Sequence, residues 1–279
     1  MVKKLRVDEG GITPLLGAMI VLGMVIAVSS AFLATWGPSE MNRREREHMQ
    51  IIGEDFRDLR TTIDGLQVGE SRVISLKMGP DPVPFIPSPK MSGTLSVMPA
   101  SIPSPTSPSY WENYWENYWE NNPGNIKFEL GNQGWIYEMG MIILTQDNVK
   151  LMDSAPRVVT VWEAGGNELG VYVDIIKVRG LESSISGTGT SSVTVSILRR
   201  FEKNENRDNA VIKIWENTSY RNAWREYLAS ENQRLNAKRY GASFDENTLT
   251  LTIQGKDNTP GAKDIKYYQK VTEVWVSIS

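Results

Sequence analysis

The chain contains no cysteine and only one histidine, His48, among its 279 residues. The absence of cysteine excludes disulfide bonds, thiolate metal sites and a cysteine nucleophile. His48 stands among charged residues of an expected helix, so we expect it to be a solvated surface residue. Metal centres built from histidines and Ser-His-Asp triads would have to depend on this one residue. We therefore predict a protein without a metal ion or a cofactor.

The sequence also lacks a basic excess and a recognisable catalytic motif. Its formal net charge is −3, with a pI near 5.5, so nucleic acid is not an expected partner. No glycine-rich phosphate-binding loop is found. Glu138, Glu163 and Asp174 flank or lie within expected strands, where we interpret each as a polar-face or edge residue. We therefore do not expect an enzyme, although acids distant in sequence could meet in the fold.

Charged residues are missing between Glu9 and Glu40, and this stretch is largely apolar. A helix needs about 20 apolar residues to cross a bilayer, and Ile12–Trp36 exceeds that length. A secretory signal has a shorter apolar region followed by a cleavage site, whereas this run continues to Trp36, an interfacial residue type. The sequence therefore predicts a membrane helix (11–36) in contact with lipid. Small residues that would permit close helix packing are Gly17, Ala18, Gly23, Ala27, Ser29 and Ser30.

Positive charges flank the apolar run on both sides. Lys3, Lys4 and Arg6 precede it, and Arg43, Arg44 and Arg46 follow it. Because basic residues favour the cytoplasmic side, these two groups oppose each other and leave the orientation nearly balanced.

Residues 37–66, which we call the stem, are predicted to continue the helix. Apolar residues recur at intervals of three and four, which is typical of a helix with one buried face. This stem seam comprises Met49, Ile52, Phe56, Leu59, Ile63 and Leu66. Two interpretations stay open: the seam packs on the chain's own β domain, or part of it contacts neighbouring subunits.

The middle of the chain is compositionally unusual. Nine of the fourteen prolines lie in residues 79–109, which predicts an exposed extended loop because proline lacks an N–H donor. The tetrapeptide YWEN then occurs three times over residues 110–121. Trp111, Trp115 and Trp119 would form an aromatic strip that could stack on sugars or contact a subunit. Alternatively, the repeat is a tandem duplication in a tolerant surface loop.

The remainder of residues 67–279 reads as short alternating strands separated by turn signals. One segment, Ser219–Gly241, has helical spacing, with Ser219 as the expected cap at its start and Gly241 at its end. The sequence therefore predicts an α+β fold, with a long N-terminal helix and a mainly antiparallel β-sandwich-like domain that carries one additional helix. Asn217-Thr218-Ser219 is an N-glycosylation sequon, so Asn217 is a candidate modification site.

The order of these features resembles archaeal type IV pilin-like proteins. A short basic leader, the segment DEGGITPLLG, a long apolar helix, a charged stem and a β-rich remainder occur in that order. The resemblance implies a class III leader (1–10) that a prepilin peptidase removes between Gly10 and Gly11, or after Gly11 so that the chain begins at Ile12. The acidic pair before Gly10 and the length of the chain differ from the family's usual pattern.

The resemblance further implies that the helix is retained, anchors the precursor and later packs in a filament core. The expected partners are copies of the chain or other pilin-like subunits, with the N-terminus inside and the β-rich domain outside. The alternative hypothesis is a membrane-tethered adhesin, in which Trp111, Trp115 and Trp119 of the YWEN repeat bind carbohydrate.

Overall fold

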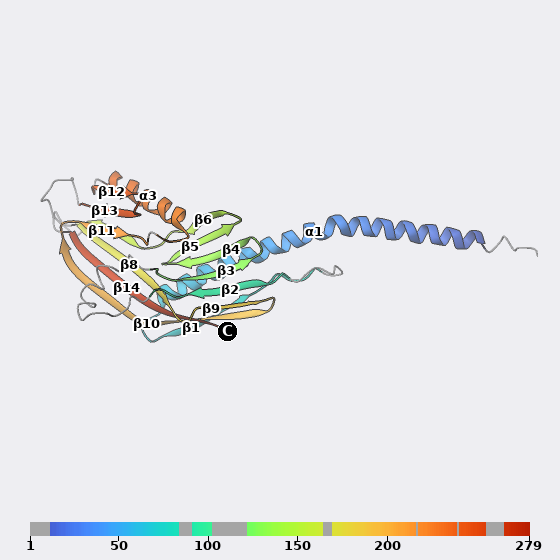
Figure 1. Ribbon diagram of the computed structural model, residues 1–279, viewed down its shortest axis with the longest axis horizontal. Helices are drawn as coiled ribbons and strands as arrows, with labels where there is room; N and C mark the ends of the chain where they lie inside the picture. The colour runs from blue at the N-terminus through green and yellow to red at the C-terminus, as the bar shows by residue number, and fades with distance from the viewer. Residues whose placement is uncertain are drawn as a thin grey trace, which may run out of the picture. The chain divides into compact units, whose positions relative to one another are not determined.

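The computed structural model describes residues 12–83, 91–101, 122–163, 169–215, 217–238, 240–254 and 265–279. Within these residues the chain forms the long helix α1 (Ile12–Gly65), the helix α3 (Arg221–Ala237) and fourteen strands (Figure 1). The predicted α+β fold is confirmed. The chain divides into two compact units, one of Met1–His48 with Pro80–Lys90, the other of Met49–Gly79 with Met91–Ser279.

Three sheets make up the β-rich part. The first, sheet A, has the order β1 (Ser71–Lys77), β10 (Thr190–Arg207), β14 (Ile265–Ile278), β8 (Leu169–Arg179) and β7 (Val159–Glu163). Sheet B has the order β6 (Val149–Ser154), β5 (Met141–Gln146), β4 (Gln133–Glu138), β3 (Asn125–Leu130), β2 (Gly93–Met98) and β9 (Ser183–Gly187). Sheet C has the order β11 (Ala210–Lys213), β13 (Thr250–Ile253) and β12 (Ala242–Asp245). The strand pairs are antiparallel except for β14 with β8.

Strand β2 corrects the prediction that residues 79–109 form an exposed loop throughout. Residues 93–98 contain no proline, and they pair with β3 on one side and β9 on the other. Leu95 and Val97 alternate inward and are 0% and 1% exposed. A strand can form here because all six residues from 93 to 98 carry the backbone N–H that the ladder needs.

Sheet A buries opposite faces at its two ends. In β8, odd-numbered residues from Leu169 to Ile175 belong to one core, whereas Ile176 and Val178 belong to a second. The β10–β14 register shifts between Ile197 and Arg199, at the point where the buried face changes. Because alternate strand residues point to opposite faces, one long sheet contributes side chains to both cores.

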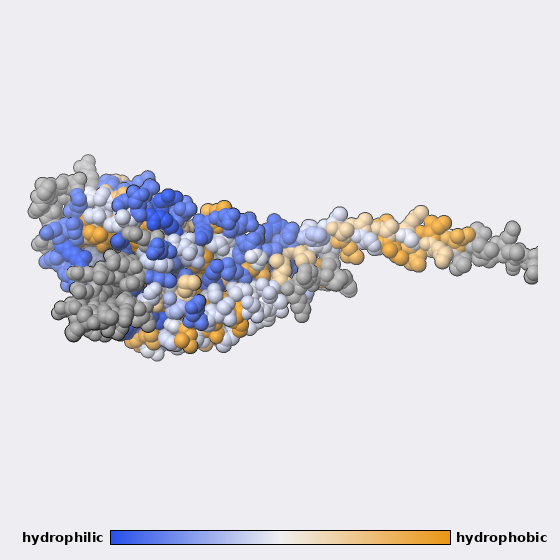
Figure 2. Space-filling model, in the orientation of Figure 1, coloured by the Kyte–Doolittle hydropathy of each residue, from blue (hydrophilic) through white to orange (hydrophobic). Residues whose placement is uncertain are grey.

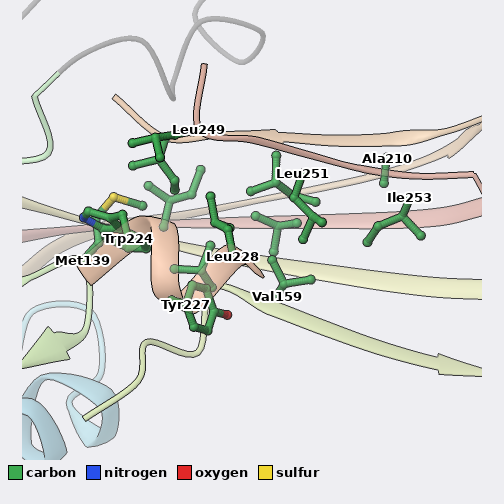
Figure 3. Packing of buried hydrophobic residues seen from close by; sticks show 14 of the residues in the cluster. Met139, Val159, Ala210, Trp224, Tyr227, Leu228, Leu249, Leu251 and Ile253 are labelled. Atoms are coloured by element: carbon green, nitrogen blue, oxygen red, sulfur yellow. The ribbon is translucent and has the colours of Figure 1, made fainter. Parts of the chain in front are cut away.

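The first core lies beneath α3 and sheet C. Figure 3 shows Trp224, Tyr227 and Leu228 of α3 gathered with Leu249, Leu251 and Ile253, and all are part of one buried cluster. The prediction that Ser219 caps this helix is wrong. α3 begins after Tyr220, and no side chain caps its start. The hydroxyl of Thr218 instead accepts a hydrogen bond from the Tyr220 N–H at 3.1 Å.

Candidate membrane anchor and helix-packing site

The N-terminal part of α1 presents apolar side chains that nothing in the described structure covers. From Leu16 to Trp36 the large apolar residues are 37–70% exposed, with Val28 at 70% and Met24 at 64%. Figure 2 shows this part of the helix mostly in the orange of hydrophobic residues. At 1.5 Å per residue these 21 positions span about 30 Å, the thickness of a bilayer's hydrocarbon core. One helix of the described chain is thus long and apolar enough to cross a membrane.

Polar and aromatic groups near the end of this run suit an apolar solvent. The Thr35 hydroxyl donates back to the carbonyl oxygens of Ala31 and Phe32, both at 3.1 Å. A hydroxyl bonded in this way does not need water. The rings of Phe32 and Trp36 stack with their centroids 5.7 Å apart, which is the i, i+4 contact that a helix permits.

A charge cluster follows directly after Trp36. Glu40 pairs with Arg43 at 2.7 Å and with Arg44 at 2.9 Å, and Arg43 also pairs with Glu47 at 2.6 Å. Hydrogen bonds from Arg43 and Arg44 lower the pKa of Glu40 to about 2, so this carboxylate stays ionised at neutral pH. Arg44 also donates to the carbonyl of Pro82 at 2.7 Å. The apolar stretch therefore ends sharply, as expected at a headgroup boundary.

The small residues predicted for helix packing do not all share one side of α1. All six are exposed. Because successive residues turn by about 100°, Gly23, Ala27 and Ser30 lie on one side, while Ala18 and Ser29 lie on another. A Cβ added at Gly17 or Gly23 would meet nothing within 4 Å. The processing residues Gly10 and Gly11 lie outside the described residues, and the helix begins at Ile12.

The stem seam is buried within the unit that contains the β sheets. All six seam residues join one core cluster with residues of sheets A and B, and Ile52 and Phe56 are 0% exposed. This answers the question that the sequence left open for these residues: the seam packs on the chain's own β domain. The seam residues are therefore not available to contact neighbouring subunits.

Gly53 allows the stem to approach sheet B closely. A Cβ at this position would lie 2.5 Å from the indole of Trp135. The Trp135 Nε1–H donates to the carbonyl of Met49 at 2.7 Å, and the Arg57 guanidinium lies 5.7 Å from the centre of the same ring. Arg57 also pairs with Asp153 at 2.6 Å. One tryptophan thus fixes the stem on the sheet through packing and a buried hydrogen bond.

His48 contradicts the sequence prediction, because it is buried with only 3% of its surface exposed. It precedes Ile52 by four residues, so it shares the seam side of the helix. The charged neighbours along the sequence suggested solvent, but helical spacing was the better guide.

Glu138 is a second buried group that the sequence analysis misplaced. We expected an edge or polar-face residue, but it is 1% exposed at the end of β4. Its Oε1 accepts hydrogen bonds from Trp224 Nε1 at 2.7 Å and from the Thr218 hydroxyl at 3.1 Å. Burial raises the pKa of Glu138 to about 7, although these hydrogen bonds oppose the rise. Both partners are distant in sequence, so no local signal could have identified the site.

A buried ion-pair cluster occupies sheet A. Glu273 of β14 pairs with Arg179 of β8 and with Arg199 of β10, both at 2.5 Å. Burial opposes ionisation of Glu273, but hydrogen bonds from the two arginines outweigh it and lower the carboxyl pKa. Lys177 is also buried, and desolvation together with Arg179 lowers its pKa to about 7. The two arginines thus balance the charge of the Glu273 carboxylate within the sheet. The described residues contain no group of His, Asp or Glu suited to a metal ion.

The remaining candidate residues are placed only in part. Asn217 is exposed, whereas Thr218 of the same sequon is buried. Trp111, Trp115 and Trp119 lie outside the described residues. The side chain of Glu163 is likewise not described. Asp174 lies on β8 and pairs with Lys270 at 3.0 Å.

No protein-family model, curated protein or solved structure matches this chain.

Proposed function

We propose that this chain is a non-enzymatic, pilin-like cell-surface protein that its apolar N-terminal helix holds in the membrane. The observation that carries the proposal is the helical, uncharged and exposed segment from Leu16 to Trp36. In water, such a surface would be strongly unfavourable, since each buried CH₂ is worth about 0.8 kcal/mol. Lipid, or the same helix of sister subunits, would cover it.

The stem supports retention of the helix in the mature protein. α1 is continuous from Ile12 to Gly65, and its last part supplies six side chains to a core shared with sheets A and B. A cut behind the apolar run would separate the anchor from this core, whereas a cut near Gly10 would leave it attached. We therefore propose a leader that is removed before Ile12, an N-terminus inside and a β-rich domain outside.

Two measurements on native cells test the proposal. Protease treatment of intact cells should digest the β-rich domain, and the same domain should be protected if it faces inward. Mass spectrometry of the purified protein should find a mature chain beginning at Gly11 or Ile12. Recovery of the full-length protein in the soluble fraction without detergent would disprove membrane anchoring.

A further inference from the structure

A polar groove of about 790 Å³ lies on the face of sheet B that points away from the stem seam. Residues of β3, β4 and β5 form its floor, and Trp215, Ser219 and Tyr220 form one wall. This volume is within the range of about 300–1,000 Å³ that is typical of small-molecule sites. The groove lies entirely within the unit that contains the three sheets.

Gly134 of β4 lies between two residues that line the groove, Glu129 and Thr145. The strand registers align Glu129 with Gly134 and Gly134 with Thr145, so these three positions form one row across the sheet. A Cβ at Gly134 would lie 2.8 Å from the Thr145 hydroxyl and 3.4 Å from Cγ of Glu129. Any larger residue at 134 would therefore enter the space between two lining side chains.

The wall is held rigidly by contacts to the sheet. Buried Glu138 accepts the Thr218 hydroxyl, and Lys150 Nζ donates to the Ser219 carbonyl at 2.6 Å. The same ammonium lies 5.1 Å from the centre of the Tyr220 ring. The Trp215 carbonyl accepts the Thr218 N–H at 3.2 Å. A preorganised wall of this kind lowers the entropic cost of binding.

The chemistry of the lining favours a neutral, hydroxyl-rich ligand. Asn125, Gln133, Ser96 and Thr145 contribute amide and hydroxyl groups to the groove. Its lysines are already engaged, since Lys127 pairs with Glu129 at 2.6 Å and Lys150 binds the wall. An anion would therefore meet carboxylates without a spare cation, and an apolar ligand would leave the amides unsatisfied.

We propose that this groove binds a short neutral oligosaccharide, with the apolar face of one sugar ring against Trp215 and the hydroxyl groups on the amide and hydroxyl side chains of sheet B. Such a ligand presents both donors and acceptors, which matches side-chain amides, and its C–H face suits an aromatic ring. The residues that line the groove do not belong to the apolar helix, and the proposed binding does not depend on membrane anchoring.

Titration calorimetry on the full-length protein in detergent micelles tests this proposal. The probes are maltohexaose, cellopentaose, mannopentaose and chitopentaose, with hyaluronan hexasaccharide as an anionic comparison. At least one neutral probe should bind saturably below about 10 mM and more tightly than the anionic one. Absence of saturable binding by all four neutral probes would overturn the proposal.

Variants locate the binding. Trp215→Ala and the filling variant Ser96→Tyr should each weaken binding at least about tenfold, while Trp275→Ala, an exposed tryptophan on sheet A, should leave it unchanged. Equal circular dichroism spectra and melting temperatures show that each variant is folded. Replacing Trp111, Trp115 and Trp119 together by alanine should not change the affinity. Loss of binding in this triple variant, with Trp215→Ala unaffected, would assign the sugar to the repeat and overturn the groove.

Discussion

Glu138 owes its raised pKa to a site that three separate segments build. The carboxylate ends β4, and its hydrogen-bond donors come from α3 and from the segment before it. Since burial disfavours the charged form, the folded protein holds the proton more tightly than the unfolded chain does.

The Glu138 shift predicts stability that falls as pH rises. The pKa of Glu138 is about 7 in the folded protein, against an ordinary value of 4.5. The stability that protonated Glu138 contributes is therefore fully present below about pH 4.5 and is lost as the pH rises through about 7. The full loss would be of the order of 3 kcal/mol. Urea unfolding of the wild type and Glu138→Gln in detergent, at pH 4 and pH 8, measures this. The wild type should be relatively more stable at pH 4, and parallel pH profiles would contradict the prediction.

Glu273 shows the opposite electrostatic situation, because two arginines hold it ionised inside sheet A. Glu273→Gln leaves Arg179 buried without its counter-charge and should lower the free energy of unfolding by about 3–5 kcal/mol. Asp153→Asn is a matched control, since it breaks the more exposed pair with Arg57 and should cost about 1 kcal/mol or less. Chemical denaturation gives both values, and equal losses would show that the buried pair is not special.

At the level of elements, the contact between the stem and sheet B depends on a missing side chain. Gly53 gives up helix propensity, but it lets the Trp135 indole lie directly against the helix backbone. The glycine is therefore retained for packing.

Gly53→Ala should destabilise the protein by about 1–3 kcal/mol, because the new methyl group overlaps the indole and the gain in helix propensity is smaller. Gly65→Ala tests the substitution where a Cβ would meet nothing within 4 Å, and it should change stability by less than about 1 kcal/mol. Thermal unfolding followed by tryptophan fluorescence compares the two. A neutral Gly53→Ala would mean that the stem does not lie this close to Trp135.

At the scale of the whole molecule, the long helix α1 has two different environments along its length. From Leu16 to Trp36 its large apolar side chains are exposed, whereas from Met49 one side is buried in a protein core. The same helix therefore contributes both the proposed membrane anchor and part of the core of the β-rich domain.

Val25→Arg should reduce membrane insertion, since a charge at the centre of a spanning helix costs about 2.5–3.5 kcal/mol. Ile51→Arg is the matched control: Ile51 is 50% exposed and Val25 55%, on the same helix, but Ile51 lies beyond the apolar run. Carbonate extraction of membranes should release a larger fraction of Val25→Arg than of the wild type or Ile51→Arg. Equal retention of all three proteins would contradict a bilayer location for Val25.

The local patterns of the sequence were sufficient for some elements. The run without charge from Ile12 predicted the exposed apolar helix, and spacing of three and four predicted every buried residue of the stem seam. These features depend on helix and strand periodicity, which neighbouring residues determine by themselves.

Contacts between distant segments decided the rest. Residues 93–98 of the proline-rich region form strand β2 because β3 and β9 supply its partners. The pKa of Glu138 depends on Thr218 and Trp224, and the groove depends on rows that β3, β4 and β5 form only when paired. By itself, the sequence determined which faces are apolar. Only the tertiary structure decided what covers them, because burial and hydrogen-bond partners are properties of segments brought together in space.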